Sequence, residues 1–287
     1  MPPTGPLPVV SLAIAAAGLA LTAATGAGSQ ACRVVAHPTP SLHTTCRHAD
    51  LRRINLAGRD LRYADFTGSS MQRANLSRAD LSGARLPRAN LTRANLSAAR
   101  AVGARMTAAG LTYANLTGAD FTGARMNGMI MFTRANLTGA DFTNANLGSA
   151  VLIRATVTGA DFTGARLTNV GASGVVGQPA ALPSGWQAVQ GRFVGPAANL
   201  WGASFTDADL SGINLAGANM IYVSILGNST LRGASLTGAA MDGMTWGWDF
   251  SANGGAGGPD GGTIICPDGS VAMSGYASGL PGVSAGC

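Results

Sequence analysis

Residues 74–83 read Ala-Asn-Leu-Ser-Arg-Ala-Asp-Leu-Ser-Gly, which is a five-residue unit written twice. Counted in fives from Leu51 to Met126, fifteen of sixteen positions hold Leu, Phe or Met, and the exception is Ala101. Ala stands two residues before thirteen of these sixteen positions. A period of five fits neither an α-helix nor a simple β-strand, so the chain has to turn once in every unit.

Each unit predicts a short extended segment followed by a turn. In one example, Ala79 and Leu81 are two residues apart and therefore point to the same side of the segment. Asp80 and Ser82 point to the other side, and Gly83 stands where the chain turns. We therefore expect a narrow interior filled by alternating small and large apolar side chains, with polar side chains in water.

The repeated triplets resemble the pentapeptide-repeat family, whose consensus is Ala, then Asp or Asn, then Leu. They include Ala74-Asn75-Leu76, Ala79-Asp80-Leu81 and Ala119-Asp120-Phe121. The resemblance extends over residues 49–170 and 198–246, and it implies an all-β fold. The family fold is a right-handed quadrilateral β-helix, in which each coil is made of four such units. Coils about 4.8 Å apart would then stack into a rod on the order of 40 Å long.

The five-residue phase breaks at several places, and each break carries an expectation. One extra residue near Met129 and another after Ile225 predict local bulges. Arg59 occupies an inward position, so we expect a local distortion there. Residues 171–197 lose the pattern and predict an extruded loop or hairpin. In the core, three aromatic side chains are expected to stack as a ladder: Phe121, Phe142 and Phe162.

The two ends differ in composition from the repeats. Residues 1–31 are typical of a signal peptide, because the stretch from Pro8 to Ala24 is apolar and small residues follow it. An uncleaved membrane anchor and a lipoprotein cleaved before Cys32 are the alternatives, and secretion or display at the cell surface is the expectation. Residues 32–48 and 247–287, the latter rich in Gly, are expected to cover the exposed ends of the coil.

Four cysteines are consistent with an oxidising destination. Sequence alone allows three ways of pairing them. The pairs Cys32–Cys46 and Cys266–Cys287 are favoured, because the long repeat array separates the two groups. Each bridge would close a short loop and contribute on the order of 3 kcal/mol to stability.

The sequence shows no constellation of residues that indicates catalysis. It has no Lys and no Glu, so its 19 cations are Arg and its 13 anions are Asp. The three histidines, His37, His43 and His48, lie beside the first cysteine pair, but their spacing matches no zinc pattern. The Gly- and Asp-containing segment 254–269 lacks a calcium-loop signature. We therefore predict a non-enzymatic protein with no metal and no cofactor.

A coil of four units, taken from the resemblance, would align outward side chains in columns. The candidate anion-binding column is Arg53, Arg73, Arg93, Tyr113, Arg134 and Arg154. A second basic column is Arg85, Arg105, Arg125, Asn146 and Arg166, and a mostly acidic column between the two is Asp60, Asp80, Arg100, Asp120, Asp141 and Asp161. Stacked arginines repel each other unless an anion or a neighbouring Asp screens them.

Two interpretations of the basic columns remain open. Either the first column binds an anionic polymer, such as a cell-wall polymer, nucleic acid or anionic lipid, or it is a solvated face that keeps the rod soluble. Nucleic acid is the less favoured partner for an exported protein. The acidic column supports the second interpretation, because neighbouring columns can partly neutralise each other.

The sequence therefore favours an exported interaction or structural module with an unknown protein or anionic polymer as partner. A further candidate contact is formed by Trp186 and Phe193, which either project for recognition or pack back on the rod. A homodimer through a coil end near Trp246 and Trp248 is also conceivable. The competing class is an intracellular DNA mimic that protects or inhibits an enzyme such as gyrase, as some members of the family do. The net charge of +6 and the export signal disfavour it.

Overall fold

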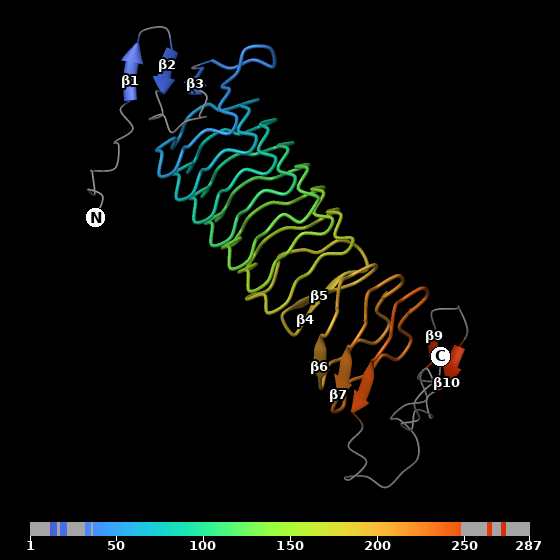
Figure 1. Ribbon diagram of the computed structural model, residues 1–287. Helices are drawn as coiled ribbons and strands as arrows, with labels where there is room; N and C mark the ends of the chain where they lie inside the picture. The colour runs from blue at the N-terminus through green and yellow to red at the C-terminus, as the bar shows by residue number, and fades with distance from the viewer. Residues whose placement is uncertain are drawn as a thin grey trace, which may run out of the picture.

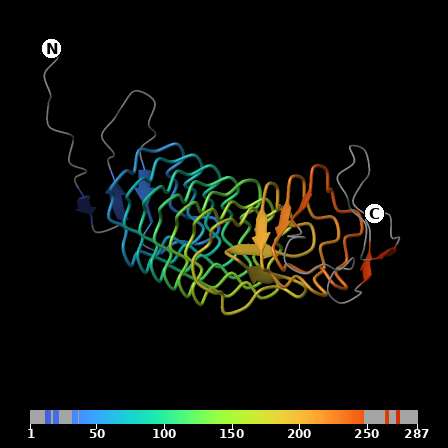
Figure 2. The same cartoon turned by 90° about the horizontal axis from the view of Figure 1, so that it is seen from below.

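The computed structural model describes residues 12–15, 18–21, 32–35, 37–247, 263–265 and 271–273. Its main body is a rod of stacked coils (Figure 1), and the coils follow one another regularly when the rod is turned (Figure 2). Only short strands and single-residue bridges are present among the described residues. No helix capable of crossing a membrane is found among them.

Ten short strands can be named. They are β1 Leu12–Ala15, β2 Gly18–Leu21, β3 Cys32–Val34, β4 Gln187–Val189, β5 Arg192–Val194, β6 Ser204–Thr206, β7 Ser224–Leu226, β8 Thr245–Gly247, β9 Thr263–Ile265 and β10 Val271–Met273. The first three form an antiparallel sheet, β4 pairs with β5 and β9 with β10 in the same sense, and β6, β7 and β8 form a parallel sheet.

Most contacts between coils are bridges between residues four units apart in the sequence. Asn75 pairs with Asn95, which in turn pairs with Asn115. The amide of Leu76 donates to the carbonyl of Asn95 at 2.7 Å, and Ala79 closes the turn by donating to Leu76 at 3.1 Å. A regular unit thus pairs its backbone with the adjoining coils and within its own turn, as buried backbone requires. This confirms the expected coil of four units.

The inward Ala and Leu positions form the core of the rod. Leu76, for example, has no exposed surface. The expected aromatic ladder is confirmed: the rings of Phe121 and Phe142 stack at 5.2 Å between centroids, and those of Phe142 and Phe162 at 5.1 Å. Buried side chains fall into two clusters, one ending at Phe193 and the other beginning at Val194.

Both one-residue slips are present. Gly110 pairs with Met131, one residue beyond the regular spacing, and Met129 absorbs the extra residue in a left-handed conformation with φ 56°. The second slip lies between Asp209 and its partner Thr230, which are likewise one residue further apart than regular partners. The core therefore keeps its phase, because each surplus residue is placed in a turn.

The distortion expected at Arg59 is wrong. Its amide donates to Leu56 at 3.2 Å and its carbonyl accepts from Asp80 at 2.9 Å, as in regular units. Its side chain is exposed. Asp60 bridges to Asp80 alone among the described residues, so this part of the first coil has an open side through which the side chain can leave.

The disulfide Cys32–Cys46 closes a loop within the N-terminal cap, which confirms the first predicted pair. Parallel pairing begins at Thr45, which bridges to Asp65, within the predicted cap. Beside it the buried Thr44 hydroxyl accepts a hydrogen bond from the amide of Val35 at 3.0 Å. The proposed bridge Cys266–Cys287, residue Trp248 and most of residues 1–31 and 247–287 lie outside the described residues.

Residues 171–197 contain a hairpin, but the hairpin is not extruded. The coil continues at first, since Gly171, Val176 and Ala181 still bridge to the coil before them. Strands β4 and β5 then form the hairpin, and β5 pairs antiparallel with the coil through Arg192 and Ser173. The hairpin packs into the stack because its apolar residues fill the interior where the repeat pattern is lost.

The hairpin joins the coils that precede it, the first stack, to the coils that follow it, the second stack. The side-chain amide of Gln190 donates to the carbonyl of Thr206 and accepts from its amide at 3.2 Å, as a neighbouring strand would. The guanidinium carbon of Arg192 lies 5.4 Å from the ring centroid of Phe205. Burial beside this ring lowers the pKa of Arg192 from its ordinary value.

Backbone bonds also connect the stacks across the hairpin. Asn169 donates to Ala197 at 2.7 Å, and Asn199 donates to Val170 at 3.2 Å. The second bond repeats the pattern seen between coils, in which Gly171 donates to Ala150. Residue 199 therefore occupies the face that residue 171 occupies one coil earlier, and the corners of the rod can be followed from one stack into the next.

Candidate functional site

The predicted anion-binding residues lie at one corner of successive coils. We call this corner the arginine edge, and it consists of Arg53, Arg73, Arg93, Tyr113, Arg134 and Arg154. Each member is the second residue after an inward Leu, Met or Phe, at the turn of its unit. Arg73 donates its amide to Thr92 at 3.0 Å, and Arg93 donates to Thr112 at 2.9 Å. These backbone bonds hold neighbouring side chains one coil apart.

All members of the edge have a left-handed backbone, with φ between 55° and 60°. Glycine is the residue that adopts this conformation without steric cost, and it holds most of the turn positions at two of the other three corners, as at Gly118, Gly139 and Gly159. An L-residue here costs roughly 1–2 kcal/mol. The edge is thus the one corner of residues 53–154 at which no turn residue is Gly and long side chains are kept in spite of the backbone cost.

Tyr113 orders the two arginines beside it. The guanidinium carbons of Arg93 and Arg134 lie 5.3 and 5.5 Å from the centroid of its ring. Nη1 of Arg134 also donates to the Tyr113 hydroxyl at 2.8 Å. Each cation–π contact at an exposed site contributes about 0.5–1 kcal/mol. The ring therefore separates two positive charges and restricts their movement.

The faces of the coil separate the edge from the acidic column. In the coil that begins at Ser70, Arg73 stands at the corner between Ser70 and Asn75, both of which are neutral. The acidic column, represented by Asp80, lies on the next face, and the second basic column, represented by Arg85, follows it. The acidic column thus adjoins the second basic column rather than the edge, which weakens the expectation that it neutralises both.

The ion pairs of the acidic column do not reach the edge. Arg62 pairs with Asp60 at 2.7 Å, and Arg100 with Asp120 at 3.8 Å. The hydrogen bond from Arg62 holds the pKa of Asp60 below its ordinary value. Within the described part of the chain, no ion pair shorter than 4.0 Å includes an arginine of the edge. The edge is therefore a row of uncompensated positive charge.

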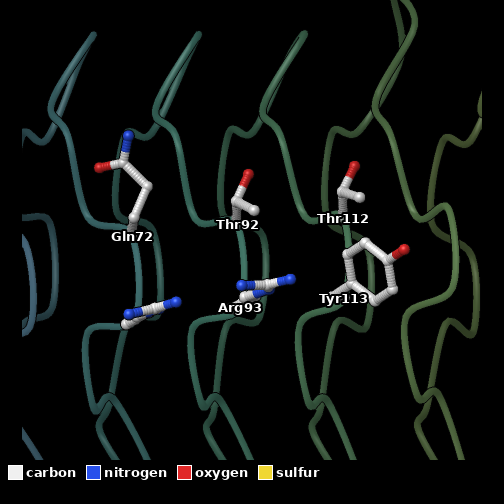
Figure 3. Close-up of a pocket in the computed structure, with 6 residues that line it drawn as sticks. Gln72, Thr92, Arg93, Thr112 and Tyr113 are labelled. Atoms are coloured by element: carbon white, nitrogen blue, oxygen red, sulfur yellow. The ribbon is translucent and has the colours of Figure 1, made fainter.

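A shallow groove of about 420 Å³ runs beside the edge (Figure 3). It is lined by Gln72, Arg73, Thr92, Arg93, Thr112 and Tyr113. Oε1 of Gln72 is the one buried side-chain oxygen among the described residues that has no hydrogen-bond partner. The groove thus combines cations with hydroxyl groups, and it crosses several coils rather than closing around one small molecule.

Comparison with known sequences assigns the family. A family profile described as pentapeptide repeats, with 8 copies, matches residues 49–86, 89–128, 132–169 and 197–225, just over half of the chain. The chain belongs to the pentapeptide-repeat family. The matched segments coincide with the coils seen in the structure and leave out the hairpin. No curated protein matches the chain significantly.

Solved structures similar to this pentapeptide-repeat protein come from the same family. A pentapeptide repeat protein from the Arabidopsis thaliana thylakoid lumen is 42% identical over 33% of this chain and 66% of its own, with a TM-score of 0.33. HetL, involved in heterocyst differentiation regulation in the cyanobacterium Nostoc sp. strain PCC 7120, is 27% identical over 80% and 92% of the two chains, with a TM-score of 0.24. Full-length QnrB1, a plasmid-mediated fluoroquinolone resistance protein, is 17% identical over 72% and 95%, with a TM-score of 0.24.

Of the two interpretations of Trp186 and Phe193, packing back on the rod agrees with the structure. Phe193 is buried, and its ring meets the edge of Phe162 at 5.3 Å, so it cannot serve as an exposed anchor. Trp186 is half-buried and packs against both core clusters. Sequence reasoning missed Trp201 and Tyr222, which are exposed. The five-residue phase places both outside, since they follow the inward Leu200 and Met220 by one and two residues.

The cap histidines do not form a metal site in the described part of the chain. No group of three or more His, Cys, Asp or Glu side chains that could hold a metal ion is found among the described residues. The ring of His48 instead lies over Gly68, where an added Cβ would be 2.7 Å from its Cε1 atom. Its cysteine neighbours, Cys32 and Cys46, are bonded to each other.

Proposed function

We propose that this pentapeptide-repeat protein is a non-enzymatic interaction module whose arginine edge binds an anionic polymer. The observation that carries the proposal is the row of arginines that have left-handed backbones and lack ion pairs within the described part of the chain. Backbone cost and mutual repulsion both oppose such a row in the free protein. A bound polyanion offsets the repulsion. Polyanion binding would therefore account for arginines at positions where the backbone favours glycine.

The extent of the edge favours a polymer over a small anion. Neighbouring coils are about 4.8 Å apart, so five arginines present charge along six coils, with Tyr113 in the coil between Arg93 and Arg134. A polymer with repeated phosphate, sulfate or carboxylate groups can engage several of them at once. The open groove beside Arg73, Arg93 and Tyr113 gives room for its backbone.

We also propose that the protein acts outside the cytoplasm. The disulfide between Cys32 and Cys46 supports this location, because such bonds persist in oxidising compartments. The same bond occupies the sulfur that lipid attachment at Cys32 would require, which favours a secreted protein over a lipoprotein.

Binding to anionic polymers across a salt series tests the edge. The probes are polyphosphate, an anionic polysaccharide, single-stranded DNA and anionic vesicles. Five engaged arginines predict a slope of about −3.5 in a plot of log affinity against log salt, or roughly a 100-fold loss between 50 and 200 mM salt. A variant with Arg73→Ser, Arg93→Ser and Arg134→Ser should keep a slope of only about −1.4.

The matched control changes the second basic column by the same charge. It carries Arg105→Ser, Arg125→Ser and Arg166→Ser, all at exposed positions. If the edge binds the polymer, the control retains most of the affinity of the unmodified protein. Equal losses of affinity in the two variants would show that net charge alone determines binding. Absence of binding by the unmodified protein would refute the proposal.

A further inference from the structure

An exposed aromatic pair stands on the second stack. Trp201 is 63% exposed and Tyr222 is 60% exposed. Their rings meet edge to face, with centroids 6.2 Å apart and an angle of 82° between planes. Between residues 177 and 245 no other large apolar side chain is exposed. The pair is therefore an isolated apolar site rather than part of a larger hydrophobic surface.

The coil backbone holds both rings in place. Tyr222 has φ 59°, at the same position of the unit as the arginines of the edge. Its ring covers Gly243, where an added Cβ would lie 2.5 Å from Cδ1 of the ring. The amide of Trp201 donates to Oδ1 of Asn199 at 3.3 Å, and Asn219 donates to the same oxygen at 3.3 Å. The side chains thus project from regular coils rather than from a loose loop.

The pair lies at the corner that carries the arginine edge. Asn199 occupies the face of Gly171, as its bond to Val170 shows, so Gly202 and Tyr222 follow Gly174 at the same corner. Gly174 itself lies next to Arg154, whose Cγ would be 3.5 Å from an added Cβ. A polymer that leaves the edge at Arg154 and continues along the rod would reach the aromatic pair.

The surroundings of the pair are polar and almost uncharged. Ser204, Ser224 and Thr245 follow on the adjoining face, where the Thr245 hydroxyl donates to Ser224 at 2.7 Å. Asp242 is exposed one coil beyond Ile221. Hydroxyl groups and one carboxylate can form hydrogen bonds with the hydroxyls of a ligand. None of these four neighbours is an arginine that could bind a phosphate group.

We propose that Trp201 and Tyr222 bind a sugar ring of a polysaccharide. The C–H groups on one face of a sugar ring are attracted to the electron-rich face of an aromatic ring, and its hydroxyls suit the polar rim. The site is too small for the core of a protein interface, which needs several hundred Å² on each partner. The inference deepens the proposed function, on which it rests for the identity of the polymer: the polyanion on the edge is an anionic polysaccharide.

Neutral sugars test the aromatic site without involving the edge. The probes are hexasaccharides of β-1,4-linked glucose and of β-1,4-linked N-acetylglucosamine, titrated into the oxidised full chain and followed by calorimetry. The variants are Trp201→Ala and Tyr222→Ala. The matched control is Tyr63→Ala, because Tyr63 has φ 59° and lies over Gly83 in the same way but has no tryptophan beside it.

We expect at least one hexasaccharide to bind, with affinity at least 10-fold weaker in Trp201→Ala and in Tyr222→Ala and unchanged in Tyr63→Ala. The variant with three edge arginines replaced should bind the neutral sugar normally and lose affinity for the anionic polysaccharide alone. If the unmodified protein binds a neutral hexasaccharide but no anionic polymer, the proposal for the arginine edge is rejected and the proposal for the aromatic site stands. If no hexasaccharide binds, or if only vesicles or DNA depend on Trp201, the sugar site is refuted.

Discussion

Replacing Arg73 with Gly is expected to make the rod more stable and to lower its affinity for a polyanion. The backbone of Arg73 is left-handed, with φ 60°. Its side chain makes no hydrogen bond or ion pair within the described part of the chain. Removing the side chain therefore relieves backbone strain and charge repulsion without breaking a polar contact.

The magnitude follows from two opposing effects. An L-residue in the left-handed region costs roughly 1–2 kcal/mol. Glycine lowers this cost, but it also gives the unfolded chain more freedom, which opposes folding by about 0.5–1 kcal/mol. The net gain is on the order of 1 kcal/mol for Arg73→Gly. Arg73→Ser removes the charge but keeps an L-residue, so its stability should change by only a few tenths of a kcal/mol.

Urea unfolding followed by far-ultraviolet circular dichroism measures the difference, read from the shift in midpoint at an unchanged slope. The reverse substitution Gly118→Ser is the control, since this glycine has φ 63° and open space around it, and it should lose about 1 kcal/mol. Both Arg73 variants should bind the polyanion equally weakly. An Arg73→Gly protein that is no more stable than Arg73→Ser would refute the reasoning from backbone strain.

Three further outcomes are expected. Reducing the bond between Cys32 and Cys46, which are 14 residues apart, should lower the free energy of unfolding by about 3 kcal/mol, measured by urea titration with and without reductant. Phe142→Ala should cost about 3–5 kcal/mol, because Phe142 has no exposed surface and stacks on two other rings; a loss below about 1 kcal/mol would contradict the aromatic ladder. Arg62 depresses the pKa of Asp60, so this pair stabilises the protein above the unfolded pKa of about 3.9 and the contribution disappears as the pH falls through the folded pKa. Asp60→Asn should therefore reduce the loss of stability on acidification, and an identical pH profile for the two proteins would exclude that role.

The repeats could be predicted from the sequence because the periodicity alone determines which side chains point inward. The stacking of Phe142 on its neighbours followed from this periodicity, from the coil of four units that the family resemblance implies, and from the extra residue near Met129. The alignment of Arg73 with Arg93 followed from the coil length. What counting could not give is the backbone conformation at these residues, since glycine, rather than Arg, is typical of a left-handed turn.

The hairpin and the first coil were less predictable, because their structure depends on contacts outside the repeat. Nothing in the local pattern shows that Phe193 enters the core between the stacks, since that depends on the ring of Phe162 being uncovered there. Arg59 was expected to disturb the coil because a buried guanidinium would be costly. The open side of the first coil removes that cost, and only the three-dimensional arrangement reveals it.

The division of each coil into four units limits how this protein can change its length. An insertion of four units adds a whole coil and lengthens the arginine edge without bending it. An insertion of a single unit would instead move every later arginine to a different corner, while the interior remained filled. Duplication of whole coils is thus the kind of change that preserves a ligand path along the rod, and the surplus residue at Met129 shows that a turn can absorb a small error without loss of alignment.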